Sequence, residues 1–163
     1  EDEESDEDDE PAAACADPTT DKAPPLSPEA ARAQAEKEKE EGNNLFKRGD
    51  MTGAVAHYQK SLELFPDNPV VHSNCSAAFL KAGAHAQALA NAEAAIALDK
   101  TYVKAFHRRA AALRALGRKQ EALADYQTVL ASLPGNAQAL QEIREIKAEL
   151  ETETQAAAQG KGA

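Results

Sequence analysis

Small residues recur along the chain at a constant spacing of 34 residues, and the apolar positions between them follow a helical period. The residues that keep this spacing are Gly49, Gly83 and Gly117, and then Ala54, Ala88 and Ala122. Each repeat has room for two helices of about 14 residues, with the glycine directly after the first helix, where a left-handed backbone costs least. We therefore predict three helix pairs, over residues 35–68, 69–102 and 103–136.

Other positions of the repeat predict how the two helices of a pair meet. The eighth residue is small in every repeat, as is the twentieth, which allows the paired helices to approach closely. Tyr58 and Tyr126 add bulk at the twenty-fourth position, and a proline closes the second helix of the first and third repeats. The middle repeat departs from this pattern, because Ala92 replaces the tyrosine and Lys100 replaces the proline. We expect a locally looser helix pair there.

A seventh helix is predicted over residues 136–156, beginning at Asn136 after a proline and a glycine. Its apolar stripe consists of Leu140, Ile143, Ile146 and Leu150. Charged residues occupy its other faces, as expected of a helix that covers the bare face of a terminal repeat. We expect residues 157–163, which are small and polar, to be frayed.

This arrangement resembles the tetratricopeptide repeat, whose period and alanine and proline positions are those described above. The resemblance covers residues 35–151 and implies an all-α superhelix (α-solenoid) of three helix-turn-helix repeats plus a C-terminal capping helix. The chain also resembles a narrower group of these domains. The residues that carry this resemblance are 104–109, 116–118 and 134–136, together with the end of the capping helix. That group belongs to proteins of chaperone-dependent complex assembly and dynein-arm preassembly.

Charge divides the chain into an acidic arm and a balanced domain. Residues 1–34 hold 12 of the 28 acidic residues and only two bases, whereas the remainder has 16 of each, so the net charge of −10 comes from the N-terminal segment. We predict that residues 1–26 are a disordered acidic arm and linker, because they lack the apolar groups that could offset the entropy of ordering. Ser27, Pro28 and Glu29 form a helix-start signal. The ordered domain is therefore predicted over 27–156.

Composition excludes several classes of function. No apolar run is long enough to cross a bilayer and no secretory signal is present, so we expect no membrane association and a cytoplasmic location. The two cysteines and four histidines make no metal-ligand spacing, and nothing resembles a catalytic nucleophile with its base. An acidic arm opposes nucleic acid. We expect a monomer that is not an enzyme and needs no metal or other cofactor.

The first helices of such repeats line a concave groove, and polar residues are expected on their inner faces. These residues are Lys39 and Asn43 in the first repeat, Asn74 in the second, and Lys104 and Arg108 in the third. Three cations and two amides offer fixed positive charge and many hydrogen-bond donors, which suits a carboxylate. A chain that ends in an acidic residue presents two carboxylates close together. The candidate ligand is therefore the C-terminus of another protein.

The same five residues resemble the two-carboxylate clamp of chaperone-binding tetratricopeptide domains. That resemblance implies a co-chaperone adaptor that binds the Glu-Glu-Val-Asp C-terminus of heat-shock protein 90 or heat-shock protein 70, for the assembly of client complexes. By the same analogy, Ala77, Leu80 and Lys81 would contact upstream residues of the ligand. The resemblance does not indicate which chaperone is preferred.

Two other classes of function stay open. The chain opens on Glu1 rather than methionine, so we expect a fragment of a longer protein. One alternative is the targeting module of a larger enzyme, such as a phosphatase or a prolyl isomerase, because such enzymes carry domains that resemble this one. A structural scaffold, for instance in a cilium, would use the convex face or the cap, and its groove would ignore free peptides.

The acidic arm also has two interpretations. It can serve as a solvating linker, as charged segments commonly do. Alternatively, residues 1–10 visit the cationic groove and compete with the ligand.

Overall fold

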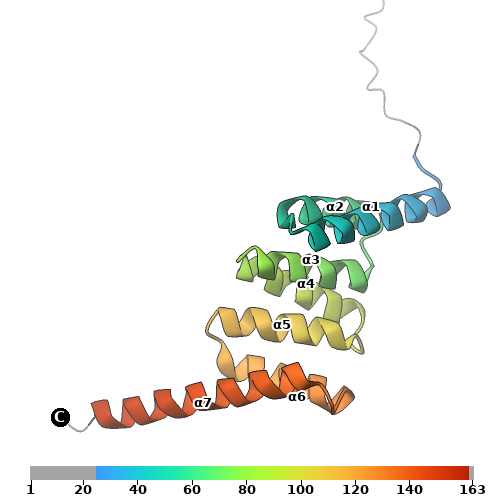
Figure 1. Ribbon diagram of the computed structural model, residues 1–163. Helices are drawn as coiled ribbons and strands as arrows, with labels where there is room; N and C mark the ends of the chain where they lie inside the picture. Colours follow the sequence, from blue (N-terminus) through green and yellow to red (C-terminus); the bar gives the residue numbers. More distant parts are fainter. Residues whose placement is uncertain (1–24, 162–163) are drawn as a thin grey trace, which may run out of the picture.

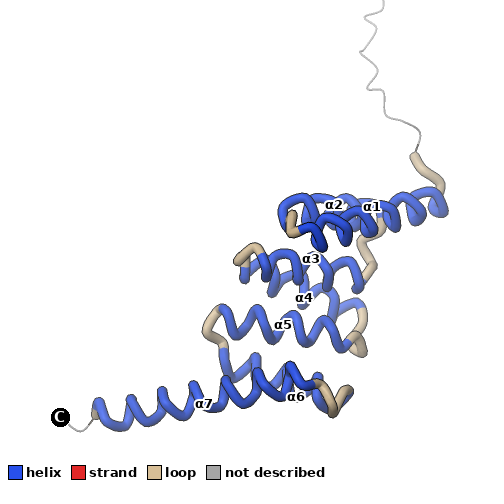
Figure 2. Tube along the Cα trace, in the orientation of Figure 1, coloured by secondary structure: helices blue, strands red, loops and turns tan. Residues whose placement is uncertain are grey.

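The computed structural model describes residues 25–161, and the described part of the chain is entirely helical apart from short loops (Figures 1 and 2). Residues 1–24 of the predicted disordered arm and linker, which include the acidic segment 1–10, lie outside it, as do residues 162–163 of the predicted frayed tail. The helices are α1 (Pro28–Arg48), α2 (Met51–Leu64), α3 (Pro69–Lys81), α4 (His85–Leu98), α5 (Val103–Ala115), α6 (Lys119–Ser132) and α7 (Ala137–Gly160). None of these helices is both long enough and apolar enough to cross a membrane.

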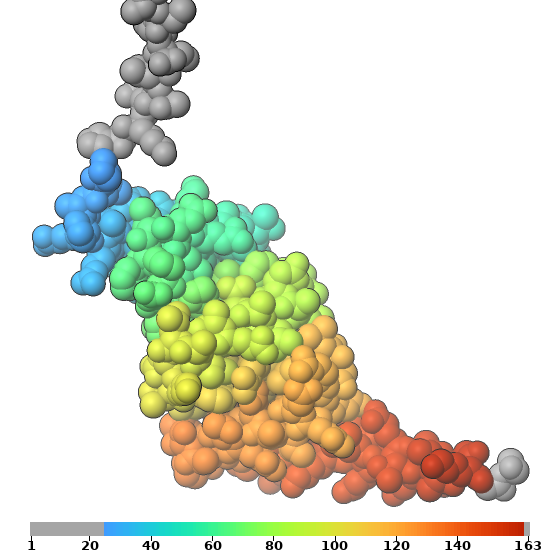
Figure 3. All heavy atoms as spheres, turned by 180° about the vertical axis from the view of Figure 1, so that it is seen from behind, coloured from blue at the N-terminus to red at the C-terminus, as the bar shows by residue number. Residues whose placement is uncertain are grey.

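The helices pack as consecutive pairs that stack into a ladder (Figure 1). α1 packs on α2, α3 on α4 and α5 on α6, while α7 packs on α6. The first helices of successive pairs also touch, because α3 contacts both α1 and α5. The space-filling view shows the same order of layers from the other side (Figure 3). The prediction of an all-α superhelix of three helix pairs with a capping helix is confirmed.

Left-handed glycines end the first helix of each pair. Gly49, Gly83 and Gly117 have φ angles of 87°, 77° and 80°. A residue with a Cβ atom is strained at such angles, so glycine turns the chain sharply into the second helix. Side-chain caps start several helices: Ser27 Oγ accepts from the backbone N–H of Ala30, and Asn136 Oδ1 accepts from that of Ala139.

Small residues let the paired helices touch, as the repeat pattern predicts. A Cβ atom added at Gly42 would lie 2.6 Å from Cε1 of Tyr58, so glycine gives this ring its space. Ser76 Oγ donates a buried 2.7 Å hydrogen bond to the carbonyl oxygen of Ala88 across the middle pair. These contacts hold α1 against α2 and α3 against α4.

The core consists of two clusters at opposite ends of the stack. The first contains Ala54, Tyr58, Val71, Cys75 and Ala78. The second contains Ala110, Leu113, Ala122, Tyr126, Val129, Ala139, Ile143 and Ile146. Ala92 lies between them, and although it stands where the other repeats have tyrosine, it is fully buried.

The capping helix differs from the sequence interpretation in two respects. α7 continues to Gly160, beyond residue 156, and residues 157–160 are helical rather than frayed. Alanines at 156–158 favour a helix, and no stop signal precedes the glycine. Leu140 is 38% exposed, so the buried stripe of α7 consists of Ala139, Ile143 and Ile146 instead.

Candidate functional site

Asn43, in the C-terminal part of α1, is the centre of the polar groove. Its Oδ1 atom accepts a 2.6 Å hydrogen bond from the hydroxyl of Tyr58 on α2 and a 3.2 Å bond from Nδ2 of Asn74 on α3. The carbonyl oxygen of an amide can only accept, so this oxygen faces both donors, and the Asn43 NH₂ group points away from them. The amide nitrogen of Asn43 and the second N–H of Asn74 therefore remain available as donors to a ligand.

Arg108 on α5 shares a pocket with both asparagines. The residues lining this pocket, which we call the asparagine pocket, are Asn43, Phe46, Lys47, Tyr58, Asn74, Ala77 and Arg108. Three of the five predicted clamp residues thus converge from α1, α3 and α5, together with Ala77. A guanidinium and two oriented amides around one hollow provide several donors and no carboxylate, which is an arrangement suited to an anion.

Lys104 lies on the same helix as Arg108 but borders a neighbouring pocket. The residues lining this second pocket are Val103, Lys104, His107, Arg108, Val129, Leu133, Asn136 and Gln138. Arg108 borders both pockets and so connects them. Lys104 is exposed, and no carboxylate within residues 25–161 forms an ion pair with it.

Lys39 is the predicted clamp residue that the structure places least directly in the site. It borders neither pocket, and its ammonium group pairs with the carboxylate of Glu36 on the same helix. Exposed pairs of this kind contribute about 0–1 kcal/mol, so a ligand carboxylate could replace Glu36 at little cost.

The three residues predicted as secondary ligand contacts also differ in how closely they approach the asparagine pocket. Ala77 lines the asparagine pocket, and Lys81 lies 4.4 Å from the centre of the Phe46 ring, which lines it too. Leu80 is half-buried and borders neither of the two pockets.

The sequence analysis missed Lys47, a cation that lines the asparagine pocket. Lys39, Asn43 and Lys47 follow one another at intervals of four residues, which places them one above the other on α1. This spacing was a signal that could have identified Lys47.

Burial fixes the protonation of several groups near the site. It raises the pKa of Tyr58 to about 12, so its hydroxyl keeps the proton that it donates to Asn43. Burial also lowers the pKa of His107, as does the nearby charge of Arg108, while Glu142 acts in the opposite direction. The His107 ring packs edge-on against Tyr126, with the ring centres 5.5 Å apart, and its buried Nε2 atom forms no hydrogen bond within residues 25–161. His107 is therefore neutral near pH 7.

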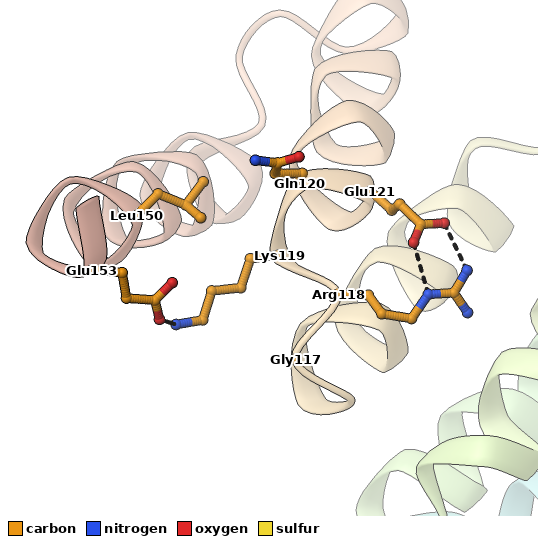
Figure 4. A pocket seen from close by; sticks show the side chains of 7 residues that line it. All are labelled: Gly117, Arg118, Lys119, Gln120, Glu121, Leu150 and Glu153. Atoms are coloured by element: carbon orange, nitrogen blue, oxygen red, sulfur yellow. Dashed lines mark hydrogen bonds and ion pairs between the residues drawn. The ribbon is translucent and has the colours of Figure 1, made fainter. Parts of the chain in front are cut away.

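Other charged residues of the third repeat serve the fold. Arg109, beside Arg108, donates two 2.7 Å hydrogen bonds to the buried carboxylate of Asp125 on α6. Figure 4 shows a separate hollow near the start of α6, where Arg118 pairs with Glu121 and Lys119 with Glu153 of α7. It includes none of the predicted clamp residues.

Solved structures of known proteins share the fold of this chain. The first tetratricopeptide domain of Spaghetti (RPAP3), solved with the HSP90 peptide SRMEEVD, is 37% identical and superposes with a TM-score of 0.72, covering 74% of this chain and 95% of that one. The second tetratricopeptide domain of human RPAP3, solved with the HSP70 peptide SGPTIEEVD, is 36% identical. It superposes with a TM-score of 0.68, covering 74% of this chain and 98% of that one. The narrower likeness is thus confirmed for RNA polymerase II-associated protein 3, whereas the likeness to a dynein-arm preassembly protein stays a prediction.

Longer relatives contain the same domain as one part. Serine/threonine-protein phosphatase 5 of Rattus norvegicus is 37% identical over 131 residues, which are 80% of this chain and 26% of the relative. RNA polymerase II-associated protein 3 of Homo sapiens is 39% identical over 108 residues, which are 66% of this chain and 16% of the relative. The chain thus spans about a quarter or less of the length of these curated relatives. The family model of the TPR repeat matches residues 42–83, and the chain belongs to the tetratricopeptide-repeat family.

Proposed function

We propose that the groove binds the C-terminal tail of heat-shock protein 90 or heat-shock protein 70 by its carboxylates. The observation that carries this proposal is the convergence of Asn43, Asn74 and Arg108 on one pocket. The chain would then act as a co-chaperone adaptor that brings a chaperone to a client complex in the cytoplasm. It would need no catalytic group of its own.

Each clamp residue has a role that follows from its chemistry. The asparagine amides, oriented by Tyr58, would donate to the terminal carboxylate, and Arg108 would supply charge between the two pockets. Lys104 would bind the side-chain carboxylate of the last residue. Lys39 would join after leaving Glu36, and Lys47 would add charge at the opposite end of the stripe on α1. Charge-assisted hydrogen bonds of this kind are worth about 1.5–3 kcal/mol each.

The two RPAP3 domains support this assignment, because each was solved with a chaperone peptide that ends in Glu-Glu-Val-Asp. They bind peptides of different chaperones at similar identity to this chain. The comparison therefore supports the class of ligand rather than a choice between the two.

The proposal is tested by titrating the chain with the peptide Met-Glu-Glu-Val-Asp, beside the same peptide amidated at its C-terminus. Binding at about micromolar Kd that is lost on amidation supports carboxylate capture. Equal affinity for both peptides, or no binding of either, refutes it.

A second candidate is a targeting module of a larger enzyme. It is favoured by the 37% identity to phosphatase 5 over 131 residues. Groove binding is common to both candidates, so they differ only in what flanks these 163 residues. A phosphatase domain in the adjoining coding sequence would support this candidate, and its absence from the complete gene product would refute it.

A further inference from the structure

The groove carries more positive charge than its own carboxylates balance. Its cations are Lys39, Lys47, Lys81, Lys104 and Arg108. Within residues 25–161, Lys39 alone among them forms an ion pair with a carboxylate. Arg109 and Arg114, on the same helix as Arg108, are by contrast held by acids on neighbouring helices. Within residues 25–161, four of these five groove cations therefore have no carboxylate partner.

The largest block of opposite charge belongs to the same chain. Residues 1–10 contain nine acids and no base. The rest of the chain is balanced, because residues 35–163 hold 16 acids and 16 bases, so the excess of acid belongs to the N-terminal segment. Multiple carboxylates on a short segment are the same chemical class of ligand that the groove is built to hold.

The intervening linker has a suitable length. Residues 11–27 separate the acidic segment from the start of α1. Seventeen residues span about 21–25 Å as a random coil and up to about 53 Å in the extended form that proline favours. The distance along α1 from Pro28 to Asn43 is about 22 Å, from the rise per residue of a helix. A linker that matches the span gives an effective concentration on the order of millimolar, so weak contacts suffice for occupancy.

We propose that residues 1–10 occupy the cationic groove of their own chain and compete with ligands that carry carboxylates. The contact between residues 1–10 and the groove depends on charge, so it is expected whether or not the ligand of the groove is a chaperone tail. The competition between the arm and the peptide, by contrast, rests on the proposed function. Because the attraction is screened by salt, the arm would leave the groove as ionic strength rises.

The contact can be measured on the full chain without any peptide. A nitroxide label is attached to Cys15 in the arm, while Cys75, which is buried, is left unlabelled. We expect paramagnetic broadening of the backbone amides of Asn43, Asn74 and Arg108, and little at Asn91 and Gln127 on the second helices of their pairs. A sample that mixes labelled chains with isotope-enriched unlabelled chains separates contacts within one chain from contacts between copies.

Two variants make this measurement specific. Replacing the nine acids of residues 1–10 by their amides should abolish the broadening in the groove, and Arg108→Gln should reduce it. Arg144→Gln, which removes an exposed cation of α7, is the matched control and should leave it unchanged. Broadening that survives neutralisation, that is equal on both faces, or that arises only between copies would overturn the proposal.

Competition is then measured by titrating wild type and the arm-neutralised chain with Met-Glu-Glu-Val-Asp. Neutralisation should tighten binding by about three- to fivefold at low salt, as expected when a weak tethered competitor at millimolar effective concentration is removed, and by less at high salt. Unchanged affinity at every salt concentration would overturn the competition. If neither chain binds the peptide, the proposed function fails, while the broadening still decides whether the arm occupies the groove.

Discussion

Arg108 and Arg114 lie on the same helix, six residues apart, and have opposite surroundings. Arg108 borders two groove pockets, and no carboxylate of the described chain pairs with it. Arg114 is held by three glutamates of α7, Glu142, Glu145 and Glu149. α5 thus presents one cation to a ligand and uses the other to fasten the cap.

The comparison teaches that residue type alone does not separate binding cations from structural ones. The partners of Arg114 lie 28–35 residues away in sequence, on a helix that closes the stack. A guanidinium that is fully satisfied within the fold has few donors left for a ligand. Lys104 and Arg108 on the inner helix α5, by contrast, border the groove pockets and pair with no carboxylate within residues 25–161.

The largest effect is expected from Arg108→Ala in the groove. We predict a loss of about 2–3 kcal/mol in affinity for Met-Glu-Glu-Val-Asp, because a charge-assisted contact disappears. The free energy of unfolding should change little, since Arg108 has no partner in the described fold. Calorimetric titration and urea unfolding measure the two quantities. Affinity equal to wild type would show that Arg108 is not part of the clamp.

Arg114→Gln should give the reverse result. We predict a loss of about 1–2 kcal/mol in the free energy of unfolding, because Glu142, Glu145 and Glu149 would then repel one another without their common partner. Peptide affinity should stay within about twofold of wild type, because Arg114 lines neither groove pocket and shares no partner with Arg108. A large loss of affinity in this variant would break the division between the groove and the cap.

The equivalent tyrosines of the first and third repeats sharpen the comparison. Tyr58→Phe removes the hydrogen bond that orients the Asn43 amide. We predict an affinity loss of about 0.5–1.5 kcal/mol. Tyr126→Phe is the matched control, because Tyr126 packs in the second core cluster and lines neither groove pocket. The account is contradicted if the two variants weaken peptide binding equally.

The smallest effect concerns His107 and pH. Its pKa is lowered in the folded chain, chiefly by burial and also by Arg108, so below about pH 6.5 the unfolded chain binds a proton that the folded chain does not. Stability should therefore fall as pH decreases from about 6.5 toward the folded pKa. His107→Phe should reduce the stability difference between pH 7.5 and 5.5 by a few tenths of a kcal/mol, roughly. An unchanged difference in urea unfolding would show that His107 does not contribute.

The sequence predicted what depends on local spacing and period. The 34-residue step predicted the glycine turns, the close contact of Ser76 with Ala88 and the order of the helix pairs. The inner position of Asn74 could likewise be read from the repeat. These features follow from which residues share a helix face, so no knowledge of distant contacts is needed.

Features that depend on side-chain geometry between helices were not predictable. The bond from Tyr58 to Asn43 requires the tilt of α2 on α1, and the pairing of Lys39 with Glu36 depends on a rotamer. Exposure of Leu140 follows from the rotation of α7 on α6, since Ala139 faces the core in its place. A periodic pattern marks the apolar face only to within about one residue on either side.

The most direct test is a cycle that combines the Arg108→Ala variant with C-terminal amidation of the Met-Glu-Glu-Val-Asp peptide. Four dissociation constants are measured, for wild type and variant with the free and the amidated peptide. If Arg108 and the asparagine pocket hold the terminal carboxylate, removing both the Arg108 side chain and the peptide carboxylate should weaken binding little more than removing either one alone. The coupling energy between the two changes should then be about 1–3 kcal/mol. Additive losses would contradict the account, because they would mean that the arginine and the carboxylate act at separate places.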